Sequence, residues 1–172
     1  SCTSRPGMAY PAQFSRSTGI QLLSLGCSGN CKMQQYFADA LVDADVDAFI
    51  FDSFSNPDAK MINERLFPFI EKLQAAHPGV PLIFQHSIYR ERRNFDHNTD
   101  AVEQAKADMA DSLMHIAVKK YKDVYYVEST NATDAHHESS VDGTHPGDNG
   151  YTLWMESIRK PVLKILKKYG IK

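Results

Sequence analysis

The segment Val141–Asn149 holds the pair of residues whose types and spacing best suit catalysis. Its sequence, VDGTHPGDN, places Asp142 three residues before His145 in a turn rich in glycine and proline. A carboxylate that accepts the Nδ1 proton of an imidazole leaves Nε2 free to take a proton from a hydroxyl, as nucleophilic acyl transfer requires. The same pattern also fits an aspartate that caps a turn beside a surface histidine. Both interpretations are open from these residues alone.

Two further segments could stabilise the negative oxygen of an acyl-transfer intermediate. Gly29, in the turn GCSGN, lets a backbone N–H approach a ligand closely because no side chain blocks it. Asn56, in the segment SFSNP, carries a side-chain amide that can donate to a developing oxyanion. Each residue also has a structural interpretation, since Gly29 could only permit a turn and Asn56 could only cap the next helix.

Taken together, these segments resemble the SGNH hydrolases, also called GDSL-like esterases and lipases. The matching blocks are Ser28-Gly29-Asn30, Asn56, and DGTHP at 142–146. The stretch SRPGMAYP at 4–11 is similar to the segment that follows the nucleophile in one branch of the family. The resemblance covers nearly the whole chain, and it implies an oxyanion hole from Gly29 and Asn56 with Asp142 and His145 as catalytic residues.

The nucleophile block of that family has no counterpart in the 172 residues. In the similar branch, the catalytic serine lies about six residues ahead of the cysteine that aligns with Cys2, which places it before Ser1. Ser1 and Ser4 do not follow an apolar strand that would hold them rigidly at a sheet edge. The resemblance therefore implies a nucleophilic serine, a central first strand and often a β-rich domain upstream of residue 1.

The function implied by the resemblance is that of a serine esterase without a cofactor. The expected substrate is a small ester, such as an acetyl ester of a carbohydrate or a similar polar compound. The side chains expected to line the substrate pocket are those of Tyr89, Arg92, Arg93 and Phe54. The family resemblance favours a periplasmic or secreted location. One alternative is a non-catalytic binding module of the same fold that lacks the nucleophile.

A metal site is a second alternative, because His136, His137, Glu138 and His145 supply nitrogen and oxygen ligands. Against it, adjacent histidines point in different directions and the H-E-x-x-H spacing is absent. Three cysteines, Cys2, Cys27 and Cys31, allow at most one disulfide, and we expect them to be packing residues or one incidental bridge.

The elements that must position these residues alternate between strand and helix. Short apolar runs predict strands at 19–26, 46–53, 81–87 and 124–129, and helical spacing predicts helices at about 33–44, 66–73, 100–120 and 149–169. Such alternation predicts a single three-layer α/β/α domain over residues 1–172, with a parallel sheet and sites at the carboxyl ends of its strands. The resemblance implies that this sheet is flavodoxin-like.

Composition limits the classes of partner. The chain has 42% hydrophobic residues and a formal charge of −2, so it is expected to fold and carries no basic field for a phosphate backbone. We therefore expect no nucleic-acid partner. No apolar run approaches the ~20 residues that a transmembrane helix needs, and no secretory leader is visible in the 172 residues.

Overall fold

The computed structural model describes residues 2–172, so Ser1 lies outside the described part. Helices, strands and short 3-10 turns follow one another in an order that begins with helices and then alternates. They are η1 (Pro6–Met8), α1 (Tyr10–Thr18), α2 (Gln35–Val42), β1 (Phe49–Phe51), α3 (Ala59–Ala76), β2 (Leu82–Gln85), η2 (Glu91–Phe95), α4 (His97–Lys120), β3 (Val124–Val127), α5 (Asp148–Leu166) and η3 (Lys167–Tyr169).

The described sheet has three parallel strands in the order β1-β2-β3. Phe49 pairs with Leu82, and Leu82 pairs with Val124 on its other side. Parallel neighbours need a long connection to return the chain to the starting edge, and α3 and α4 supply those crossovers. All three strands therefore end at one edge of the sheet, as the predicted α/β architecture requires.

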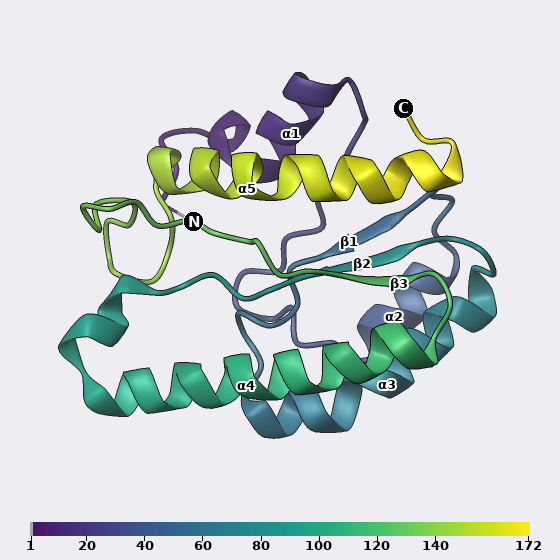
Figure 1. Cartoon of the computed structure of the whole chain (residues 1–172), viewed down its shortest axis with the longest axis horizontal. Coiled ribbons are helices and arrows are strands. Elements are labelled where there is room, and N and C mark those ends of the chain that lie inside the picture. The colour runs from purple at the N-terminus through teal and green to yellow at the C-terminus, as the bar shows by residue number, and fades with distance from the viewer. Residues whose placement is uncertain (1) are drawn as a thin grey trace.

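Helices cover both faces of the sheet. Figure 1 shows α1 and α5 on one face and α2, α3 and α4 on the other. The alternation of side chains along β2 explains the two cores, because Ile83 packs in the cluster with α1 and α5, whereas Leu82 and Phe84 pack in the cluster with the other three helices. The three-layer arrangement predicted from the sequence is confirmed.

The four predicted helices are present, and local capping explains where two of them begin. The Asp58 carboxylate accepts a hydrogen bond from the N–H of Met61 at the start of α3, and Asp96 accepts one from Asn98 at the start of α4. Lys120 lies in the last turn of α4, where the helix dipole favours a cation. Helix α5 continues through Pro161.

The predicted strand at 19–26 is wrong. This segment has no ladder partner among the described residues, and Leu23 and Leu25 are 78% and 52% exposed. An extended segment becomes a strand only when a neighbour accepts and donates its backbone hydrogen bonds. Within residues 2–172, β1 likewise pairs with β2 alone. The described sheet thus has three strands where the sequence predicted four.

Helix α1 was not predicted from the sequence. It begins with Pro11 in its first turn and ends at Gly19, whose φ of 78° is the left-handed conformation common after a helix. An early proline and a terminal glycine are the sequence features typical of such a helix. Within residues 2–172, no helix is both long and apolar enough to cross a membrane.

Candidate active site

The structure brings Asp142 and His145 into direct contact in the loop before α5. The imidazole Nδ1 lies 2.7 Å from Asp142 Oδ2. The other carboxylate oxygen, Oδ1, accepts hydrogen bonds from the N–H groups of Thr144 at 2.8 Å and His145 at 2.7 Å. The pair is therefore formed within residues 142–145, because the same turn positions the carboxylate of Asp142 and carries His145.

Gly143 makes this tight turn possible. Its φ of 73° is a conformation that side chains disfavour, and a Cβ atom would approach the backbone of Arg92 to 3.1 Å. Its carbonyl accepts a hydrogen bond from the N–H of Arg92 at 2.8 Å. We call Asp142 and His145 the dyad and the loop that carries them the dyad loop. This hydrogen bond holds the dyad loop to the segment that follows β2.

The charge state of the pair follows from these bonds. The imidazole of His145 and the two backbone N–H groups hold the pKa of Asp142 well below its ordinary value. Asp142 is therefore a carboxylate at neutral pH, which favours the tautomer of neutral His145 with its proton on Nδ1. Among the described residues, no group hydrogen-bonds to Nε2 of His145, and its side chain is half exposed. This nitrogen can accept a proton from an incoming hydroxyl.

The N-terminal residues are attached to the same loop. The N–H of Cys2 donates to the carbonyl of Pro146 at 3.2 Å, and the N–H and hydroxyl of Ser4 donate to Asp148 at 2.8 and 2.6 Å. One ligand atom each of Cys2, Asp142 and His145 lies within 4.8 Å of the others. The local sequence does not indicate that Cys2 is a neighbour of this pair, because 140 residues separate it from Asp142.

Asn56 lies in the loop that leaves the carboxyl end of β1. It is half-buried, and its side-chain amide makes no hydrogen bond to any other described residue. The preceding carbonyl, that of Ser55, accepts from Arg90 Nη2 at 2.7 Å and from Lys106 Nζ at 2.9 Å. Two cations thus hold the peptide that carries Asn56.

Glu103 completes this buried ionic cluster. One of its oxygens lies 2.9 Å from Arg90 Nη1, and the other lies 2.9 Å from Lys106 Nζ. The side chains of Lys106 and Glu103 are only 6% and 11% exposed. Burial lowers the pKa of Lys106, and burial raises the pKa of nearby Asp52, whose carboxylate accepts from the Ser55 hydroxyl. We call Arg90, Glu103 and Lys106 the ionic clamp.

One segment connects the two parts of the site. Arg90 binds the loop of Asn56, and two residues later the backbone of Arg92 binds the dyad loop at Gly143. The carboxyl end of β2 feeds directly into this segment. The loops that follow β1 and β3 are therefore held to adjacent points of the segment between β2 and α4.

Gly29 lies in an exposed turn with a φ of 79°. The turn is closed by a hydrogen bond from the N–H of Asn30 to the carbonyl of Cys27 at 3.1 Å. Cys27 and Cys31 flank it as free thiols, and Cys2 is also free. Burial is the largest cause that raises the pKa of Cys31, to about 11.

The four residues suggested as pocket lining differ in their surroundings. Phe54 is fully buried and packs against Phe84 in the core, so its predicted contact with substrate lacks support in the structure. Arg93 pairs with Asp100 at 2.7 Å and stacks over Tyr89. Arg92 is exposed, and Tyr89 is 39% exposed. Tyr89 and Arg92 are thus the two with accessible side chains.

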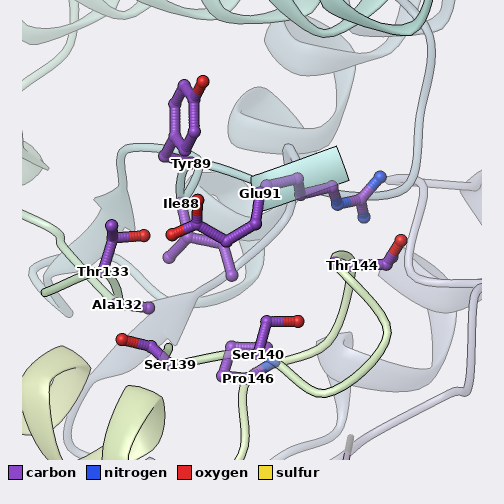
Figure 2. A pocket seen from close by; sticks show the side chains of 11 residues that line it. Ile88, Tyr89, Glu91, Ala132, Thr133, Ser139, Ser140, Thr144 and Pro146 are labelled. Atoms are coloured by element: carbon purple, nitrogen blue, oxygen red, sulfur yellow. The ribbon is translucent and has the colours of Figure 1, made fainter. Parts of the chain in front are cut away.

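A small pocket of mixed polar and apolar lining adjoins the dyad loop. Figure 2 shows Ile88, Tyr89 and Glu91 on one side of it and Ser139 and Pro146 on the other. Its free volume is about 10 Å³, close to what one water molecule needs. Glu91 is buried, and its Oε1 makes no hydrogen bond within the described part of the chain.

The histidine-rich metal site does not form as the sequence suggested. Over residues 2–172, the only group of three or more potential ligand side chains that meet is Cys2, Asp142 and His145. His137 instead pairs with Glu91 at 2.8 Å.

Comparisons with known proteins identify the family and the fold of the chain. The sequence matches the GDSL-like lipase/acylhydrolase family over residues 1–164. A structure described as a GDSL-like lipase from Bacteroides ovatus shares 37% identity and superposes with a TM-score of 0.90 over 96% of this chain. The chain spans about half the length of that structure, 49%.

Two more distant structures share the fold. The salicylyl-acyltransferase SsfX3 of a tetracycline biosynthetic pathway is 17% identical, with a TM-score of 0.71 over 95% of this chain and 50% of its own. A carbohydrate esterase family 3 protein from Talaromyces cellulolyticus is 14% identical, with a TM-score of 0.65 over 98% of this chain and 94% of its own. Among curated proteins, none gives a significant match. From the family match and the 37% identical structure, the chain belongs to the GDSL-like lipase/acylhydrolase family.

Proposed function

We propose that the protein is a serine esterase in which Asp142 and His145 activate the nucleophile. The observation that carries this proposal is the pre-oriented pair, with Nδ1 of His145 2.7 Å from Asp142 Oδ2 and with Nε2 lacking a hydrogen-bond partner in residues 2–172. Membership of the GDSL-like lipase/acylhydrolase family supports the chemistry.

The catalytic cycle begins with a serine that we assign to the sequence before residue 1, where the family motif places it. Nε2 of His145 takes the serine proton while the serine oxygen forms a bond to the ester carbonyl carbon. Asp142 holds the imidazolium that results. The bond to the alcohol oxygen then breaks, and His145 returns its proton to that alcohol. Water releases the acyl group by the same steps.

The oxyanion of each tetrahedral intermediate would be bound by the Asn56 amide and the Gly29 N–H. The absence of a hydrogen bond to the Asn56 amide within the described chain leaves it available for this task. The ionic clamp supports the assignment, because it holds the carbonyl next to Asn56 with two cations. Losing one such donor typically costs ~10²- to 10³-fold in rate.

The substrate we propose is a small ester of a polar alcohol, such as an acetylated carbohydrate. Both dyad side chains are about half exposed, so a bulky hydrophilic alcohol can reach them. The exposed residues Tyr89 and Arg92 would contact that alcohol with their polar groups. One structure that shares the fold is itself named as a carbohydrate esterase.

Hydrolysis of p-nitrophenyl acetate by the full-length protein tests the proposal. His145→Ala should abolish turnover without changing the unfolding midpoint, since the side chain is half exposed. His136→Ala is the matched control, because it removes an exposed histidine from the neighbouring loop and should leave the rate unchanged. Undiminished hydrolysis in His145→Ala would reject the assignment.

A further inference from the structure

Three different metal-binding side chains converge at the dyad. The Cys2 thiol, the Asp142 carboxylate and the His145 imidazole each place one ligand atom within 4.8 Å of the other two. Sulfur, nitrogen and oxygen donors together are typical of zinc and related thiophilic cations. Magnesium and calcium prefer oxygen donors alone, so this set discriminates against them.

The backbone fixes two of these donors before any ion arrives. The N–H of Cys2 is bonded to the carbonyl of Pro146, which adjoins His145. Asp142 uses Oδ1 to accept from two N–H groups, so its Oδ2 stays turned toward the imidazole. To reach the separations found around tetrahedral zinc, the ligand atoms up to 4.8 Å apart must close by about an ångström, and Nδ1 of His145 and Oδ2 of Asp142, now 2.7 Å apart, must open by less than that. Side-chain rotation can supply both shifts.

We propose that Cys2, Asp142 and His145 form a binding site for a thiophilic divalent cation of the Zn²⁺ type, which inactivates the dyad. On binding, the Cys2 thiol releases its proton to solvent and the thiolate, carboxylate and imidazole coordinate the ion. Solvent completes the coordination, because the dyad is half exposed.

Coordination removes the proton acceptor whichever ring nitrogen is used. Binding through Nδ1 replaces the hydrogen bond to Asp142 and leaves the proton of the neutral ring on Nε2. Binding through Nε2 occupies that nitrogen itself. In both cases His145 can no longer take a proton from a nucleophile, so metal binding and catalysis exclude each other.

Direct binding measurements test the site without any assay of activity. Titration of the full-length protein with Zn²⁺ or Cd²⁺ by calorimetry should show one equivalent that depends on Cys2, whereas Mg²⁺ should give no heat of binding at this site. Co²⁺ should give the thiolate-to-metal absorption band that marks a sulfur ligand. Cys2→Ser should remove the band and weaken Zn²⁺ binding at least about tenfold. Loss of a residue that only supports a metal ligand already costs about this much, so loss of a ligand itself should cost no less.

Matched variants separate this site from other metal contacts. Cys27→Ser removes a thiol elsewhere in the molecule and should leave the band and the affinity unchanged. His145→Ala removes a second proposed ligand at a half-exposed position, and it should weaken Zn²⁺ binding as Cys2→Ser does. Absence of stoichiometric Zn²⁺ binding, or equal affinity in Cys2→Ser, would overturn the proposal.

Inhibition is the one part that rests on the proposed esterase function. Zn²⁺ should inhibit hydrolysis by the full-length protein, and EDTA should restore it. Cys2→Ser should keep its activity and resist Zn²⁺. Hydrolysis without Zn²⁺ binding would refute only the metal site, whereas Zn²⁺ binding to a protein without esterase activity would refute only the proposed function.

Discussion

The dyad loop and the Asn56 loop reach a fixed geometry by opposite means. Asp142 and His145 are three residues apart, half exposed, and oriented by backbone groups of their own turn. Asn56 is positioned by Arg90, Glu103 and Lys106, which come from distant segments and bury their charges beneath it. One loop is ordered by local hydrogen bonds and the other by long-range ionic contacts.

This difference teaches where each loop should be vulnerable. Substituting Asp142 or His145 removes a catalytic group but little buried surface. Such a change should lower the rate and leave the free energy of unfolding nearly unchanged. A change in the ionic clamp leaves a buried charge without its partner, which costs folding free energy before it affects the rate. Mutations of the dyad should therefore lower the rate alone, whereas mutations of the ionic clamp should affect stability as well as the rate.

The largest expected effect is on the rate of Asp142→Asn. The amide cannot hold the catalytic tautomer of His145, and the corresponding change in a serine hydrolase triad costs ~10⁴-fold in kcat. We expect a loss of this order in the full-length protein. The unfolding midpoint in urea at neutral pH should fall only slightly, because the hydrogen bonds of the carboxylate lie in a half-exposed turn. A large drop in stability with kcat preserved would contradict the expectation that the dyad loop affects the rate and not the stability.

The next effect in size is on the stability of Glu103→Gln. It leaves the cations of Arg90 and Lys106 buried without their shared carboxylate, so we expect a loss of ~3–5 kcal/mol in the free energy of unfolding. Chemical denaturation measures it. Asp108→Asn, an exposed change on the same helix, is the control and should move stability by under ~0.5 kcal/mol. Equal stability of the two variants would show that the clamp contributes nothing.

A smaller effect is expected on the rate of Lys106→Met. Arg90 keeps one hydrogen bond to the Ser55 carbonyl, so the loop should survive but shift. Misplacement of Asn56 should lower kcat by about 10- to 10²-fold with KM nearly unchanged, because the oxyanion exists only after attack. Lys106→Arg, which keeps the cation, should recover part of the rate. A change in KM alone would point to a role in substrate binding.

The smallest effect concerns acid stability. Hydrogen bonds hold the pKa of Asp142 below its ordinary value of ~3.9, so the folded state favours the carboxylate. This contribution is present above that ordinary pKa and is lost as the pH falls further through the folded value. The stability difference between wild type and Asp142→Asn should therefore shrink between about pH 6 and pH 3. Urea midpoints across this range measure it, and a difference that widens toward acid would contradict the sign.

The local features were predictable from sequence, and the long-range ones were not. The spacing of Asp142 and His145 allowed the contact that the structure shows, and helical periodicity located α3, α4 and α5. The sequence around Arg90 did not predict that its side chain is buried, because its partners lie in α4 and in the loop after β1. The apolar run at 19–26 looked like a strand, but strand formation depends on a neighbour that the local sequence does not contain.

A fluorophosphonate label tests the central claim most directly, since it reacts only with a serine that a neighbouring base has activated. We expect the full-length protein to gain one adduct, on a serine before residue 1, and His145→Ala to gain none. Peptide mass spectrometry locates the adduct. An adduct that forms equally in His145→Ala, or no adduct in the wild-type protein, would contradict the assignment of His145 as the base of a serine esterase.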